Sequence, residues 1–231
     1  MITYPNVIPT TRKNISHSSL IFSNIHLIYV EHHKQVGITF YHNAKWHDHI
    51  GNICASACKI LSMIQKVKFL LRRKTLNQIY ISFLRATLEY ASVVWDICAQ
   101  YEKDKLDRIQ HEAARIVTGL TRSVSIHKLY TEIELLSLPE RRTYQKLIIA
   151  YKANNGLVPD FISSIFPHSV SCNIQYDLRN SSHYRVQNMR TQIFANSFIP
   201  SCFSNWNSLS EDLHQAQSIA ILKRSLISNY L

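Results

Sequence analysis

Apolar residues recur at intervals of three and four through the segment from residue 48 to residue 71. The members of this stripe are Ile50, Ile53, Ala57, Ile60, Ile64, Val67 and Leu71. Such a spacing places the apolar side chains on one face of an α-helix, where they can pack against a core. The pattern therefore predicts a long amphipathic helix over about 48–71.

Two further helices are predicted directly after it. The sequence TLNQ at Thr75–Gln78 has the form of a capping box and predicts a helix that ends near Trp95. Its expected inner face consists of Leu76, Ile79, Phe83, Leu84, Thr87, Tyr90 and Val94. A third helix is expected over Lys103–Thr118, because Leu106, Ile109, Ala113 and Ile116 keep helical spacing, Asp104 and Arg108 can pair one turn apart, and Gly119 can end it. Three consecutive helices with short links predict a bundle over 48–119.

The rest of the chain is less regular. SLPE at Ser137–Glu140 is a second capping box and predicts a helix to about Asn154, closed by Gly156; a last helix is expected over Ile219–Tyr230. Residues 120–231 are thus a helical region with a loop-rich stretch near 168–196. Short apolar runs in 18–42, interrupted by Gly37, predict strands within a β-hairpin region over 18–47, and residues 1–17 are expected to be poorly ordered. The predicted fold is mainly α, with a short N-terminal β-hairpin region followed by a helical bundle and further helices.

Composition adds a preference for an anionic partner. Lys and Arg number 26 against 15 Asp and Glu, a formal charge of +11, and 46% of the residues are hydrophobic, enough for a core. The five cysteines are odd in number and contain no C-x-x-C pair, which favours a reducing compartment. No run approaches the roughly 20 apolar residues of a membrane span, and no secretory signal is apparent. These features predict an intracellular protein, nuclear or cytoplasmic, that is not secreted and has no membrane partner.

Motifs for catalysis are missing from the sequence. HEAAR at His111–Arg115 has Arg115 where a zinc-protease helix needs its second histidine, and the histidines and cysteines of residues 32–58 lack the spacing of a structural zinc site. The sequence contains no phosphate-binding glycine loop and no G-x-S-x-G elbow. We expect no metal site, no cofactor and no catalytic residue in this chain.

The segment 49–88 has an unusual charge balance. It contains no Asp or Glu but seven basic residues, which are Lys59, Lys66, Lys68, Arg72, Arg73, Lys74 and Arg85. Lys and Arg bind phosphate backbones without needing a shaped pocket, so a nucleic acid is the preferred ligand for this surface. A solvated helix face is the alternative interpretation.

Seven phrases of the sequence, read in order, resemble the region after the catalytic palm in reverse transcriptases of LINE-type (non-LTR) retrotransposons, particularly the jockey-like group. The phrases are KQVGITF (34–40), WHDHI (46–50), LEYASVVWD (88–96), LDRIQHEAARIVTG (106–119), LPERR (138–142), YKANNGLVPDF (151–161) and SFIPSCFSNWNSL (197–209). Together they extend over most of residues 18–225.

The resemblance implies that different parts of the chain correspond to different parts of the polymerase. Gln35, Val36 and Gly37 would form a primer-grip-like turn at the end of the palm, and 48–119 would be the thumb that packs along the product duplex. The family usually has Leu at the position of Val36, and often His or Tyr at that of Gln35. No aspartate here corresponds to the palm pair that holds metal ions, so Mg²⁺ is expected only in a complete parent polymerase. The missing palm and fingers would be natural partners, and the oligomeric state is not predicted.

The resulting hypothesis is a truncated RNA-directed DNA polymerase without its catalytic aspartates. Its residual role would be nonspecific binding of template and primer, as duplex or RNA–DNA hybrid. The expected contacts are Lys59, Lys66, Lys68, Arg72, Arg73 and Lys74. The alternative is a non-catalytic helical domain for protein interactions, with a solvated basic face.

Overall fold

The computed structural model describes residues 21–22, 25–26, 30–166, 183–184 and 190–230. The chain divides into two compact units, residues 1–44 and residues 45–231. The expectation of poor order over 1–17, and most of the loop-rich stretch expected near 168–196, lie outside the described residues.

The first unit contains two short antiparallel strand pairs, β1 (Ile21–Phe22) with β2 (Ile25–His26) and β3 (His32–Gln35) with β4 (Ile38–Tyr41). In the second pair Gln35 lies opposite Ile38, so only Val36 and Gly37 form the loop. Both have positive φ, 48° and 77°, as in the type I′ turns that suit two-residue hairpins. The N-terminal hairpin region expected from the sequence is confirmed.

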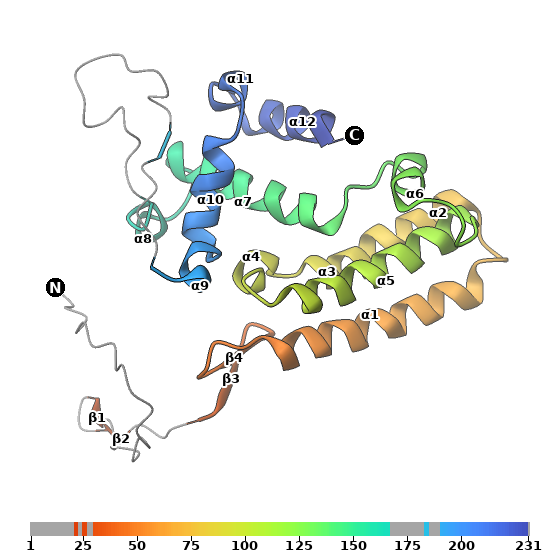
Figure 1. The fold of residues 1–231 in the computed structure, drawn as a ribbon, viewed down its shortest axis with the longest axis horizontal. Helices are drawn as coiled ribbons and strands as arrows, with labels where there is room; N and C mark the ends of the chain where they lie inside the picture. The colour runs from red at the N-terminus through yellow and green to blue at the C-terminus, as the bar shows by residue number, and fades with distance from the viewer. Residues whose placement is uncertain (1–20, 23–24, 27–29, 167–182, 185–189, 231) are drawn as a thin grey trace. The chain divides into compact units, whose positions relative to one another are not determined.

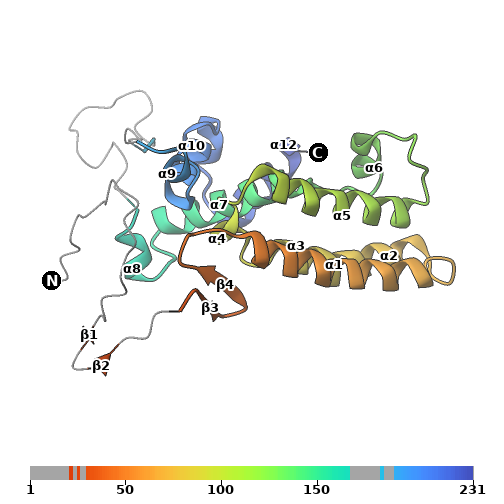
Figure 2. The same cartoon turned by 60° about the horizontal axis from the view of Figure 1, so that its bottom comes forward.

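The regular secondary structure in the described part of the second unit is helical (Figures 1 and 2). Its elements are α1 (His47–Val67), α2 (Arg73–Ile79), a π-helical segment η1 (Tyr80–Arg85), α3 (Ala86–Glu89), α4 (Ser92–Trp95), α5 (Gln100–Thr118), α6 (Ile126–Glu132), α7 (Leu138–Asn154), α8 (Asp160–Ser163), α9 (Gln192–Ala195), α10 (Phe198–Asn207), α11 (Glu211–His214) and α12 (Ile219–Tyr230). The predicted class, mainly α with a short β-hairpin region before the helices, is therefore correct.

Two groups of buried side chains hold this unit together. The first joins α1, the α2–η1–α3 helix, α5 and α6, with Trp95 and Leu106 fully buried, and it continues to Leu138 at the start of α7. The second joins the rest of α7 to α10, α11 and α12 around Leu147, Cys202 and Leu222. One helix, α7, therefore contributes to both cores.

The capping box predicted at Ser137 is present. The Glu140 carboxylate accepts hydrogen bonds from the Ser137 amide and hydroxyl, both at 2.7 Å, and the Ser137 hydroxyl oxygen accepts from the Glu140 amide at 3.4 Å. After α7 the chain turns at Gly156, whose φ is 64°. The boundaries of this helix and of α12 agree with the predictions.

The helix predicted from Thr75 to Trp95 is wrong in its start, in its end and in part of its inner face. It begins at Arg73 with Thr75 already inside it, and it breaks after Glu89, where Ala91 adopts a left-handed conformation with φ 51°. The π-helical segment also changes which side chains point inward. The buried face consists of Leu76, Tyr80, Leu84 and Leu88, while Phe83, Tyr90 and Val94 are exposed.

Other predicted boundaries shift by a turn or less. Helix α1 ends at Val67 rather than near Leu71, although its predicted apolar stripe faces the core. Helix α5 begins at Gln100 because the Glu102 carboxylate caps the Ala99 amide at 2.9 Å, and it ends, as predicted, at Gly119 with φ 73°. Asp104 accepts from Gln100 at 2.9 Å, and the described residues show no ion pair between Asp104 and Arg108.

Two buried polar clusters connect the helices. Gln110 on α5 donates to the Tyr80 hydroxyl and the Leu136 carbonyl, both at 3.0 Å, and accepts from the Tyr130 hydroxyl and the Leu138 amide at 3.0 and 3.1 Å. The second cluster is centred on Asp96, whose carboxylate contacts Lys103, Arg142 and Lys146 at 3.0, 2.9 and 2.5 Å. These contacts fix α4, α5 and α7 against one another.

Candidate nucleic-acid interface

The basic segment of the sequence forms one end of a helical hairpin. Helix α1 finishes at Val67, the Leu70 amide donates to the Val67 carbonyl at 2.9 Å, and the chain becomes extended at Arg72 before α2 begins. In Figure 1 this turn lies at the end of the bundle where α6 also lies. We call Lys66, Lys68, Arg72 and Lys74, which stand before, within and just after the turn, the basic tip.

Five of the six predicted contact residues are available to a ligand. Lys59, Lys66, Arg72 and Lys74 are exposed, and Lys68 is half-buried. Lys59 and Lys66 are seven residues apart, so they lie on the same face of α1, about 10 Å apart along its axis. Among the described residues, none of these five has a carboxylate within ion-pair distance.

Arg73, the sixth predicted residue, is already engaged. Its guanidinium contacts the Glu132 carboxylate at 2.7 Å and donates to the Glu132 carbonyl oxygen at 3.1 Å. These contacts join the start of α2 to the end of α6. Arg73 is therefore better explained as a structural residue than as a phosphate contact.

A second basic surface was missed by the sequence reasoning. A groove of about 590 Å³ is lined by Leu61 and Gln65 from α1, by Arg108, His111, Glu112, Arg115 and Ile116 from α5, and by Arg122 from the following loop. Arg115 and Arg122 contact the same Glu112 carboxylate, at 3.0 and 3.5 Å. The lining thus contains three arginines and one carboxylate, which contacts two of them, so the groove is positive. The available signal was the seven-residue interval between Arg108 and Arg115, which places both on one face of α5.

The predicted primer-grip-like turn lies in the other unit. Gln35 ends β3, while Val36 and Gly37 form the loop, so the three residues do occupy a tight hairpin turn. All three are exposed.

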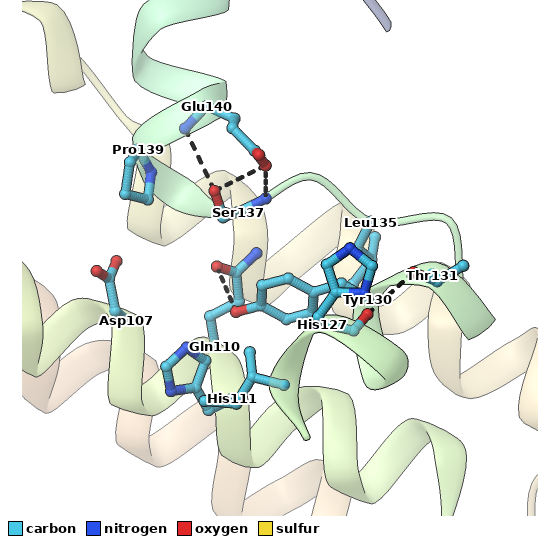
Figure 3. Close-up of a pocket in the computed structure, with 11 residues that line it drawn as sticks. Asp107, Gln110, His111, His127, Tyr130, Thr131, Leu135, Ser137, Pro139 and Glu140 are labelled. Carbon is cyan, nitrogen blue, oxygen red and sulfur yellow. Dashed lines mark hydrogen bonds between the residues drawn. The ribbon is translucent and has the colours of Figure 1, made fainter. Parts of the chain in front are cut away.

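A pocket of about 320 Å³ lies between α5, α6 and the start of α7 (Figure 3). Burial raises the pKa of Asp107, and burial together with the charge of Arg115 lowers the pKa of His111. The Ser137 hydroxyl on its wall donates to Glu140 at 2.7 Å, and the described residues show no hydrogen bond from it to either lining histidine. The pocket thus contains ionisable groups, and its Ser137 hydroxyl is engaged in the capping box at the start of α7.

The part of the chain that the structure describes has neither a metal-binding cluster nor a membrane-spanning helix. It contains no group of three or more His, Cys, Asp or Glu side chains arranged to hold a metal ion. None of its helices combines the length and the apolar character needed to cross a bilayer.

Comparison with known proteins found no match to the chain among protein-family models, curated proteins or solved structures. The resemblance to retrotransposon reverse transcriptases therefore stays a prediction from the sequence.

Proposed function

We propose that this chain binds nucleic acid nonspecifically, through the phosphate backbone, in the manner of the thumb of a LINE-type reverse transcriptase. The observation that carries the proposal is the group of five cations, the basic tip with Lys59, that have no carboxylate partner among the described residues. Cations placed together without counter-charges repel one another, and a polyanion relieves that repulsion while releasing its own counterions. Template–primer duplex or RNA–DNA hybrid is the expected ligand class.

The chain supports a role in holding the substrate rather than in transforming it. No aspartate of the sequence corresponds to the palm pair of the polymerase, and the Asp96 carboxylate is occupied by three cations inside the protein. Nucleotide addition would therefore depend on groups outside these residues.

A matched pair of charge reversals tests the proposal. Lys66→Glu with Arg72→Glu alters two exposed cations of the tip; Lys223→Glu with Arg224→Glu makes the same chemical changes on the exposed face of α12. Both variants have the same net charge, so a difference between them reports position. We expect the first pair to weaken binding of a labelled duplex at least about tenfold and the second to change it little.

Equal effects of the two pairs would show that the affinity reflects net charge alone. Undetectable binding by the unmodified chain at low salt would favour the alternative function, a helical domain for protein interactions with a solvated basic face.

A further inference from the structure

Two large apolar side chains project into solvent at the basic tip. Phe69 is 87% exposed and Leu70 is 82% exposed, whereas the next residue, Leu71, packs against the core of the bundle. Neither exposed side chain belongs to the buried cluster. The fold therefore gains little from their apolar character.

The basic residues around Phe69 and Leu70 indicate which class of ligand could contact these two side chains. The Lys68 ammonium lies 4.7 Å from the centre of the Phe69 ring, a cation–π contact, and Lys66 and Arg72 flank the pair in the chain. An aromatic ring among unpaired cations is the combination that binds single-stranded nucleic acid, since the ring stacks on a base while the cations contact the neighbouring phosphates.

We propose that Phe69 stacks on an unpaired nucleobase, so that the tip prefers nucleic acid with a single-stranded extension over a blunt duplex. This rests on the proposed function, because the same cations would bind the flanking phosphates. Stacking needs only one accessible ring, whereas adsorption to an anionic membrane needs a broad apolar face, and here that face would consist of two side chains. Every base presents a π-face, so the preference would be for unpaired structure and not for sequence.

Three substitutions at one exposed position separate stacking from other apolar contacts. Phe69→Ala removes the side chain, Phe69→Leu keeps apolar bulk without a ring, and Phe69→Trp keeps a ring. Because the native side chain is 87% exposed, none of them should disturb the core, which thermal unfolding would verify. Each full-length variant is titrated into a labelled blunt duplex, the same duplex with a single-stranded extension, and vesicles of phosphatidylcholine with phosphatidylserine.

We expect Phe69→Ala and Phe69→Leu to weaken binding to the extended duplex by about 5- to 100-fold and to change blunt-duplex binding by less than about twofold. Phe69→Trp should bind the extended duplex at least as tightly as the native chain. Its added tryptophan emission should be quenched by that ligand more strongly than by the blunt duplex.

The outcomes distinguish this inference from the proposed function. If the native chain binds neither duplex, both fail. If it binds duplex but Phe69→Ala weakens extended and blunt ligands equally, only the stacking inference fails. If Phe69→Leu binds the extended duplex as tightly as the native chain, the contact is apolar and the stacking inference fails. The stacking inference also fails if binding to the vesicles depends on Phe69 and binding to nucleic acid does not, which would indicate a membrane contact.

Discussion

Replacing Asp96 by Asn is expected to destabilise the helical unit strongly. The Asp96 carboxylate lies between Lys103 on α5 and Arg142 and Lys146 on α7, with ion-pair distances of 2.5 to 3.0 Å. The side chains of Arg142 and Lys146 are only 5% and 6% exposed. Asparagine keeps the shape of the side chain but removes the carboxylate that pairs with both buried cations.

The magnitude follows from the burial and from the excess of cations. Removing one partner of a buried pair typically costs about 3–5 kcal/mol, which is a large part of the roughly 5–15 kcal/mol that stabilises a typical domain. For a unit of this size the midpoint of thermal unfolding should fall by roughly 10 °C. Lys103→Met is the control, because its side chain is 21% exposed and two cations still remain for the carboxylate. It should cost about 1 kcal/mol or less.

The contribution of the Asp96 carboxylate to stability should depend on pH. Burial opposes ionisation of Asp96, but the hydrogen bond and charge of Lys146 and the charge of Lys103 outweigh it, so the pKa of Asp96 lies below its usual value. A lowered pKa in the folded state means that the stabilisation is fully present above the ordinary Asp pKa, about 3.9, and is lost as the pH falls through the lower folded value. The stability difference between the native chain and Asp96→Asn should therefore narrow in acid.

Urea unfolding followed by circular dichroism, repeated from neutral to acid pH, measures both effects. An Asp96→Asn cost below about 1 kcal/mol at neutral pH would show that the Asp96 charge does not hold the helical unit together. A Lys103→Met variant that is as unstable as Asp96→Asn would contradict the expected difference between the two variants.

Three further predictions concern single contacts. Gln110→Leu should lower the free energy of unfolding in urea by at least about 2 kcal/mol, because the buried Leu136 carbonyl and Leu138 amide would lose their hydrogen bonds to the Gln110 side chain. Arg73→Ala should lower stability by no more than about 1 kcal/mol, since its pair with Glu132 is partly exposed, and should weaken duplex binding less than Arg72→Ala. Gly119→Ala should lower the free energy of unfolding by about 1–2 kcal/mol, because residue 119 at the end of α5 has a left-handed φ of 73°. Unchanged stability within the error of the unfolding measurement would contradict a left-handed conformation at this residue.

The sequence was informative where local rules and tertiary packing agree. Helix α1 has a continuous apolar stripe, and α7 has a capping box followed by a glycine turn, so their positions could be predicted closely. The helix from Arg73 could not, because its break depends on a left-handed Ala91 and on the Trp95 indole donating to the Tyr90 carbonyl at 2.8 Å. Alanine rarely adopts a left-handed conformation, so the residue type at position 91 does not predict the break.

The candidate site was predictable in charge but not in detail. Counting charges identified the basic segment 49–88, yet Glu132, which pairs with Arg73, is 59 residues away in the chain. The predicted helix continues through VKFLL to Leu71, whereas α1 ends at Val67 and Phe69 and Leu70 lie exposed in the turn that follows. The interval between Arg108 and Arg115 places two of the groove's arginines on one face of α5, but the groove itself also needs α1 and the loop after α5, which no local pattern brings together.

The most direct test of the central claim is the affinity of the full chain for a mixed-sequence DNA duplex, measured across a range of salt concentrations. If the five available cations of the segment contact phosphates, log affinity should fall against log salt with a slope of about −4 to −5. The slope should become shallower by about 2 in the Lys66→Glu, Arg72→Glu variant and stay unchanged in the Lys223→Glu, Arg224→Glu control. A slope near zero, or one that the tip substitutions leave unchanged, would contradict the account.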